Sequence, residues 1–381
     1  METSGPQRAE DIAAAIPLRR RLAYVALLLA VALVLAEFAM RAVFWWKDDL
    51  PPTPDESLEY EWEWAARHLK QGGAERDPDS KHEYDPDLGW RLVPGLSGAV
   101  ATNSRGLRSD REYPPSRQPG RRRLALLGDS FTFGAHVANS TTFAHLLERE
   151  ILDGWDVLNF AVSGYGTDQA LLAWELRGGD LAADVVAMGF YVRDYERNTM
   201  RFKIYAKPVF EPAGAGLRLT GHPVIEPEAL YQEYASGRRG VGRVRVPYLA
   251  LSLGRSWRNL RERWPTTADP EWQVLSRLMR RFRDHVRAQG AHPVWLVLPY
   301  HDVVETSRSS QAAIEEMCER EARELSLPLL RVDAAFRAHA ARHPDRPLYR
   351  PREIGGHFSA EGHRLVAEIL AAELEGIPLG E

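Results

Sequence analysis

The chain has 381 residues, which is room for one large domain of ~200–250 residues with appended segments. Lysine and arginine total 49 against 53 aspartate and glutamate, so the formal charge of -4 gives no basis for a nucleic-acid-binding surface. The single cysteine, Cys318, excludes an intrachain disulfide and any zinc site built from several cysteines.

The N-terminal segment has the pattern of a membrane span. Three arginines at 19–21 precede an uncharged apolar run over 22–36, and apolar residues continue to Trp45 and Trp46. We predict a cytoplasmic tail over 1–21 and a transmembrane anchor over 22–46. A cleaved signal peptide is the alternative, but the segment before the apolar run is long for one. Asp48 and Asp49 follow the span, so we expect a single pass through a bacterial inner membrane with the later residues on the periplasmic side.

The rest of the chain divides into an extension and an α/β domain. Residues 47–120 are interpreted as a juxtamembrane linker and extension with a short helix over 57–70. Over 121–381, short apolar strands alternate with amphipathic helices, a pattern typical of a parallel sheet covered on both faces. Ser140 is the expected cap of the first helix and Ser359 that of the last. Five strands are predicted, at 124–127, 157–162, 185–190, 294–298 and 329–332.

The alternation is lost over 195–270, and we interpret this stretch as an insertion over the site. Its many aromatic residues indicate packing of a lid or small subdomain, or alternatively stacking on sugar rings.

Candidate catalytic residues follow the predicted strands, where ligands of such sheets bind. The first strand leads into a Gly-Asp-Ser turn, which presents the Ser130 hydroxyl and directs backbone N–H groups toward an oxyanion. A turn without chemical meaning is the alternative for this segment by itself. Gly164 follows the second strand and offers a further N–H group. His357 precedes the last helix, and a histidine of near-neutral pKa is what a serine nucleophile needs. His363 lies inside that helix, where a packed or surface role is expected.

Three segments, 126–131, 159–167 and 356–363, resemble the first, second and last sequence blocks of the SGNH (GDSL-like) hydrolases in order and spacing. The segments 88–91 and 102–108 resemble the extension of a membrane-tethered bacterial subgroup. The resemblance implies a three-layer α/β/α flavodoxin-like fold and esterase, lipase, deacetylase or O-acyltransferase chemistry. It makes Ser130 the nucleophile and an oxyanion donor through its N–H, Gly164 a second donor, and His357 the base.

The chain departs from the family pattern at two positions. Arg193 stands where the third block supplies an asparagine, so a donor is kept and a charge is added; the alternative is that Arg193 pairs with Asp194 or Glu196. The aspartate expected two or three residues before His357 is absent. Glu353, one step further away, is the candidate to orient the imidazole; otherwise the site is a Ser-His dyad or is impaired.

These observations predict a serine esterase or deacetylase that acts on O-acyl esters, chiefly acetyl esters, through an acyl-enzyme. The expected partners are an acylated carbohydrate or other ester substrate and the inner membrane. The anchor and the resemblance to the membrane-tethered subgroup imply that the substrate is a cell-envelope or exported polysaccharide. An O-acyltransferase of the same fold, or an impaired protein that binds polysaccharide or acts as a scaffold, are the alternatives. No cofactor or metal site is predicted, because nucleotide-binding glycine motifs, HExxH and paired CxxC motifs are absent.

Overall fold

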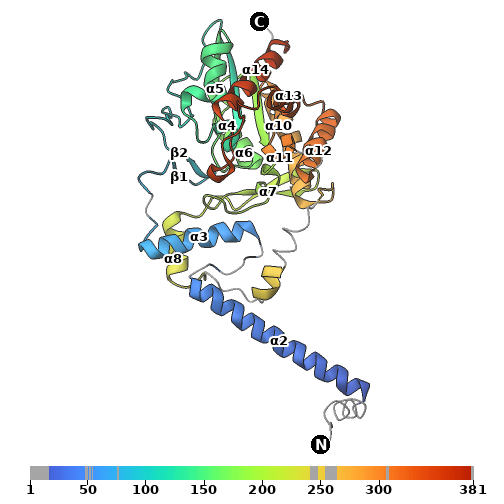
Figure 1. The fold of residues 1–381 in the computed structure, drawn as a ribbon. Helices are drawn as coiled ribbons and strands as arrows, with labels where there is room; N and C mark the ends of the chain where they lie inside the picture. The colour runs from blue at the N-terminus through green and yellow to red at the C-terminus, as the bar shows by residue number, and fades with distance from the viewer. Residues whose placement is uncertain are drawn as a thin grey trace, which may run out of the picture.

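The computed structural model describes residues 17–47, 50, 53, 55–74, 77–240, 248–253, 264–305 and 309–378. Most of helix α2 (Leu18–Lys47) extends away from the main domain (Figure 1), and none of its residues is buried. In its C-terminal half, the Glu37 carboxylate accepts the N–H groups of Tyr248 and Leu249. Within the described residues α2 is the one helix long and apolar enough to cross a membrane, a criterion that an N-terminal signal sequence also meets. The predicted span over 22–46 falls inside it.

A five-stranded parallel sheet forms the centre of the main domain. Its strands are β3 (Arg122–Gly128), β4 (Trp155–Asn159), β5 (Val185–Tyr191), β8 (His292–Leu298) and β9 (Leu329–Arg331), in the order β4-β3-β5-β8-β9. The predicted α/β class and the five strands are confirmed. The second strand ends at Asn159 and not at 162, although the Val162 N–H still donates to the Gly128 carbonyl.

Helices cover the sheet on both faces (Figure 1). Helix α5 packs against α14, whereas α10 packs against α6 and α12, and their apolar sides join the strands in one core. The helices around the sheet have the following bounds: α5 (Phe143–Leu146), α6 (Thr167–Arg177), α10 (Pro270–Ala288), α11 (His301–Glu305), α12 (Ser310–Leu325), α13 (Asp333–Arg342) and α14 (Ala360–Glu375).

Of the two predicted helix caps, one is confirmed and the other is wrong. Ser359 caps α14 by accepting the Gly362 N–H. Ser140 does not cap α5, because it lies in the preceding 3-10 turn (Asn139–Thr141), and the hydroxyl of Thr142 accepts the His145 N–H instead. A π-helical turn (Leu147–Ile151) continues α5 toward β4.

The extension before the sheet is part of the folded domain. It contains α3 (Glu56–Gln71), capped by the Asp55 carboxylate, and an antiparallel hairpin of β1 (His82–Asp85) and β2 (Gly89–Leu92). Trp90 of this hairpin is almost fully buried in the main core. Gly89 has a φ of +88°, and a Cβ there would lie 2.1 Å from the Ala206 carbonyl oxygen, so only glycine allows this contact.

The inserted segment packs against the extension. Its described elements are α7 (Asp194–Arg197), the hairpin of β6 (Val209–Ala213) and β7 (Gly216–Thr220), α8 (Pro227–Ala235), and helical residues 248–253. Helix α8 lies beside α3 (Figure 1), where the rings of Phe202 and Tyr205 contact Trp64 at centroid distances of 6.2 and 5.4 Å. These aromatic side chains pack with one another, and residues 241–247 and 254–263 of the insertion lie outside the described part.

Candidate active site

The Ser130 hydroxyl and the His357 imidazole lie within hydrogen-bond distance, with 2.9 Å between Oγ and Nε2. Ser130 is the first residue of α4 (Ser130–Phe133), directly after β3, and its side chain is mostly buried. The tight turn requires glycine before it. Gly128 has a φ of +147°, and a Cβ there would lie 2.4 Å from Thr132 Oγ1 and 2.7 Å from the Gly189 carbonyl oxygen.

His357 is delivered by a short turn ahead of α14. A 3-10 turn (Arg352–Ile354) is followed by Gly355 and Gly356, both with positive φ, and the chain then enters α14 through Ser359. Burial, aided by the charges of His136 and Arg197 and opposed by that of Asp129, lowers the pKa of His357 to about 4. The imidazole is therefore neutral at pH 7 and able to accept the serine proton.

The second ring nitrogen of His357 has no carboxylate partner in the part of the chain that the structure describes. Nδ1 is buried and without a hydrogen bond to any residue that the structure describes, and Glu353 is exposed. The expectation that Glu353 orients the imidazole is therefore not met. The left-handed conformation of Gly355 turns this residue, and not residue 353, toward the ring: a Cβ on Gly355 would lie 2.9 Å from Nδ1. Among the described residues, Ser130 and His357 are therefore hydrogen-bonded to each other without a carboxylate on Nδ1.

Gly164 lies in the loop between β4 and α6, beside the hairpin of the extension and the insertion. Its φ is +86°, and a Cβ there would lie 2.8 Å from Ile204 Cδ1 and 3.5 Å from the Trp90 ring. The Trp90 indole N–H donates to the carbonyl of Ser163 at 3.2 Å. This hydrogen bond joins the Gly164 loop to the extension. The Ser130 N–H lies at the start of a helix, where backbone N–H groups have no acceptor within the helix.

Arg193 lies at the surface. About half of its side chain is exposed, and its nearest carboxylates are Glu196 at 3.9 Å and Glu56 at 4.0 Å. Across the described part of the chain, no contact joins it to Ser130 or His357. The position of Arg193 agrees with the alternative that this residue pairs with Glu196. Among the described residues, the Arg193 guanidinium is therefore not a donor to the serine.

Two residues that the sequence did not single out lie beside Ser130. Asp129 Oδ1 accepts the Phe131 N–H at 2.8 Å, and Oδ2 lies 3.3 Å from Ser130 Oγ. Arg197 Nη1 donates to the same Oδ2 at 2.9 Å. The pairing of Asp194 with Arg197 at helical spacing is the one signal that the sequence contains for this arginine.

The segment 102–108 also supports the turn that carries Ser130. Arg108 is buried, and its guanidinium donates to the carbonyls of Phe133, Gly134 and Val137 at 2.7, 2.5 and 2.6 Å. Backbone carbonyls that leave a short helix need such donors when they are buried. Arg108 therefore fixes the exit of α4, on the side opposite to the Asp129 cap.

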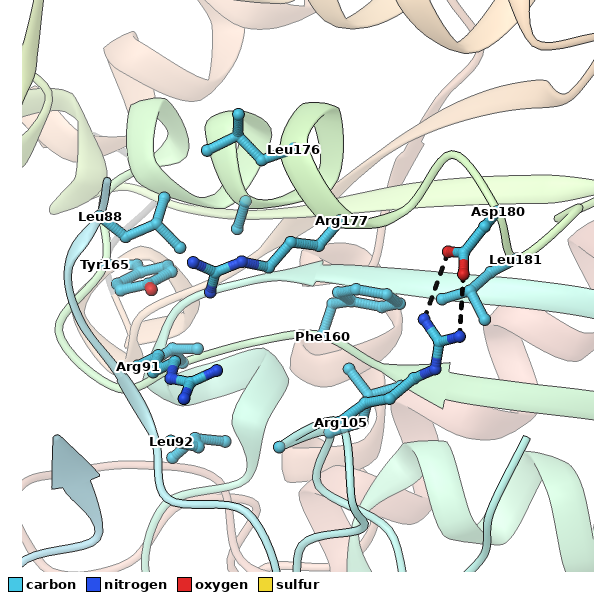
Figure 2. Close-up of a pocket in the computed structure, with 14 residues that line it drawn as sticks. Leu88, Arg91, Leu92, Arg105, Phe160, Tyr165, Leu176, Arg177, Asp180 and Leu181 are labelled. Carbon is cyan, nitrogen blue, oxygen red and sulfur yellow. Dashed lines mark hydrogen bonds and ion pairs between the residues drawn. The ribbon is translucent and has the colours of Figure 1, made fainter. Parts of the chain in front are cut away.

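A cavity of about 360 Å³ lies between the hairpin of the extension and α6. Figure 2 shows Arg105 directed at Asp180 on one side of Phe160, with Arg91 and Arg177 on the other. All three arginines have carboxylate partners: Arg105 pairs with Asp180, Arg177 with Asp85 and Arg91 with Glu83. Ser130 and His357 do not line this cavity, and the Arg177–Asp85 pair joins the hairpin to α6.

Three solved structures are similar in fold: a lipase/acylhydrolase from Enterococcus faecalis (14% identity, 68% of this chain and 99% of that chain, TM-score 0.38), a member of the lipolytic G-D-S-L family from Veillonella parvula (9%, 67% and 100%, 0.37) and the acetyl xylan esterase AlAXEase (12%, 66% and 99%, 0.38). None of the curated proteins compared with the chain matches it. The model of the GDSL-like lipase/acylhydrolase family matches residues 126–365, which include Ser130, Gly164 and His357. The chain belongs to the GDSL-like lipase/acylhydrolase family.

Proposed function

We propose that this protein hydrolyses carboxylic esters with Ser130 as the nucleophile and His357 as the general base. The observation that carries the proposal is the 2.9 Å contact between the hydroxyl and a neutral imidazole. His357 accepts the Ser130 proton as Oγ attacks the ester carbonyl, and then donates it to the leaving alcohol. Water, activated by the same imidazole, resolves the acyl-enzyme.

The oxyanion is assigned to two backbone groups, the N–H of Ser130 and the N–H of Gly164. Arg193 is left out of the catalytic group because its recorded partners are surface carboxylates. Because His357 Nδ1 has no carboxylate partner among the described residues, we expect slow turnover. Loss of the acid from a serine triad costs about 10⁴ in turnover, and the remaining groups still catalyse.

The proposed acyl group is short, with acetyl as the first candidate. Ser130 is only 7% exposed, and the rings of Phe131, Tyr191 and Tyr300 pack together beside it, with centroid distances of 4.2 Å from Phe131 to Tyr191 and 6.4 Å from Phe131 to Tyr300. These surroundings leave little room for a long acyl chain. We propose that the alcohol part is a cell-envelope or exported polysaccharide, since α2 suits an anchor that holds the domain at the periplasmic face of the inner membrane.

The test measures hydrolysis by the full chain in detergent of p-nitrophenyl esters whose acyl chains have two to twelve carbons. We expect slow turnover that is highest for acetate and absent in Ser130→Ala. Ser163→Ala, which removes a hydroxyl from the neighbouring loop, is the matched control and is expected to retain turnover. Equal rates in the Ser130→Ala and wild-type proteins would exclude this nucleophile.

The same assay separates the two alternative activities. Adding a neutral polysaccharide acceptor to the acetyl ester and measuring transferred acetyl by mass spectrometry distinguishes transfer from hydrolysis. Release of free acetate alone supports the hydrolase, and acetylated acceptor supports an O-acyltransferase. No turnover of any ester, with the fold intact, supports an impaired protein that binds polysaccharide or acts as a scaffold.

A further inference from the structure

Arg197 lies where the loops after three adjacent strands meet. Its Nη1 donates to Asp129 Oδ2 at 2.9 Å, to Asp194 Oδ1 at 3.0 Å and to the Tyr165 carbonyl at 3.4 Å. Asp129 follows β3, Tyr165 follows β4 and Asp194 follows β5, and these strands are neighbours in the sheet. One guanidinium nitrogen therefore joins the nucleophile turn to the Gly164 loop and to α7.

The charges in this cluster are buried. Asp129 and Asp194 are almost fully inaccessible, and the Arg197 side chain is only 16% exposed. Burial and the nearby charge of Asp129 raise the pKa of Asp194 well above its usual range. Although burial opposes it, the charges of Asp194 and Asp129 raise the pKa of Arg197, so the guanidinium stays charged. Removing it would leave two buried carboxylates without their cation.

The Ser130 hydroxyl has one proton and two acceptors within reach. His357 Nε2 lies 2.9 Å from Oγ, and Asp129 Oδ2 lies 3.3 Å away. Attack on an ester requires the proton to go to the imidazole. Because Arg197 donates to the same Oδ2, it occupies that oxygen and neutralises part of its charge, which weakens the carboxylate as a competing acceptor.

We propose that Arg197 is the positioning residue of this site: by holding Asp129 Oδ2 it directs the Ser130 hydroxyl to His357, and through the Tyr165 carbonyl it holds the Gly164 loop beside them. The inference rests on the proposed ester hydrolysis for its kinetic consequence. Its structural consequence, a changed environment of His357, is independent of turnover.

Residues of the insertion hold Arg197 in place. The buried Lys207 Nζ donates to the Arg197 carbonyl at 3.0 Å and to the Met200 carbonyl at 3.2 Å, and it pairs with buried Asp168. Asn198 Oδ1 accepts the Asp168 N–H at 3.1 Å, which ties α7 to the start of α6. The insertion therefore contributes to the site by locking the element that carries this arginine.

The kinetic test compares Arg197→Gln and Arg197→Lys with Arg193→Gln, which removes an exposed guanidinium from the residue just before α7. We expect Arg197→Gln to lower kcat about 100-fold, as for a misplaced catalytic group, with KM within a few-fold of wild type. Arg197→Lys should recover part of the loss, and Arg193→Gln should match wild type. Equal kcat in Arg197→Gln and Arg193→Gln would overturn the proposal.

A double substitution separates positioning from a general loss of structure. If a freed Asp129 carboxylate takes the serine proton, then adding Asp129→Asn to Arg197→Gln removes the competitor and should raise kcat above that of the single variant. A lesion that only loosens the fold would make the double variant worse than either single variant. That additive loss would contradict the proposal.

A measurement that does not depend on turnover tests the role of Arg197 separately from the proposed ester hydrolysis. The pKa of His357 is measured by NMR on the full chain in micelles with labelled histidine. The charges beside this ring are Asp129, Arg197 and His136. We expect the pKa to rise in Arg197→Gln and to fall in Asp129→Asn, while that of His82, in β1, stays at about 4. These opposite shifts support the cluster even if no ester is turned over; an unchanged His357, or a parallel change of His82, would overturn it.

Discussion

The Tyr165 hydroxyl donates a hydrogen bond of 2.6 Å to the backbone carbonyl of Trp90, which joins the Gly164 loop to the hairpin of the extension. Both residues are buried, and their rings meet edge to face with centroids 5.5 Å apart. The extension that precedes the sheet therefore supports a loop of the candidate active site directly.

Tyr165→Phe should slow ester hydrolysis without unfolding the protein. The substitution removes one hydroxyl and leaves a buried carbonyl unpaired, which costs about 1–3 kcal/mol and loosens the loop that presents the Gly164 N–H. Tyr84→Phe is the matched control, because it removes a similar bond, from Tyr84 to the Val224 carbonyl, elsewhere on the hairpin. We expect kcat to fall about 10-fold for Tyr165→Phe, a fraction of the loss seen when an oxyanion donor is removed, and to stay near wild type for Tyr84→Phe. Equal values would show that the extension does not position the loop.

The low pKa of His357 predicts an unusual pH profile. Burial lowers this pKa to about 4, so the imidazole is unprotonated at all pH values above about 5. We expect kcat/KM for an acetyl ester to stay level from neutral pH to about 5 and to fall below that with an apparent pKa near 4. A histidine with its ordinary value would give a fall near 6.5. A fall near 6.5 would mean that the free enzyme holds His357 in a more polar environment than the structure shows.

Arg108 should contribute strongly to stability. Its guanidinium donates to three carbonyls at the exit of α4. Arg108→Met leaves the Phe133 and Gly134 carbonyls with only longer contacts, from Asn159 Nδ2 at 3.5 Å and from the Val137 N–H at 3.4 Å, and we expect a loss of about 3 kcal/mol. Arg105→Met is the control from the same segment. It removes a partly exposed pair with Asp180, and such pairs contribute about 0–1 kcal/mol. Thermal unfolding of the full chain measures both, and similar losses would exclude the proposed role of Arg108.

Buried neutral histidines should make the fold sensitive to acid. Burial and the nearby charge of Lys81 lower the pKa of His82 to about 4, below its unfolded value of 6.5. Its contribution to stability is therefore complete above pH 6.5 and is lost as the pH falls toward 4, by up to about 1.4 kcal/mol per pH unit. His82→Gln should lose less stability than wild type between pH 6.5 and 4. Parallel curves for the two proteins would contradict this.

The order of elements was predictable from the sequence because apolar strands and amphipathic helices alternate with clear glycine and serine boundaries. The five strands, the cap at Ser359 and the approach of Ser130 to His357 all follow from that alternation and from the common edge where parallel strands end. The cap at Ser140 was wrong because Thr142 is also able to cap a helix, and the 3-10 turn that decides between the two residues has no simple sequence signal.

The charged part of the site was not predictable in the same way. Arg193 and Arg197 both belong to an exposed-looking charged segment, and sequence position alone favoured the first. Burial decides which guanidinium reaches Asp129, the residue beside the serine. The burial of Arg197 depends on Lys207 and Asp168, which are distant in the chain. The Glu353 expectation was not met for a similar reason: two consecutive left-handed glycines set the direction of the loop, and spacing does not reveal their φ angles.

The proposed hydrolysis depends on Ser130 as a nucleophile that His357 activates. The most direct measurement is the site of covalent labelling by a fluorophosphonate, mapped by peptide mass spectrometry on the full-length protein in detergent. We expect an adduct on Ser130 that forms much more slowly in His357→Gln and is absent from Ser130→Ala. An adduct on another residue, or equal labelling rates with and without the imidazole, would contradict it.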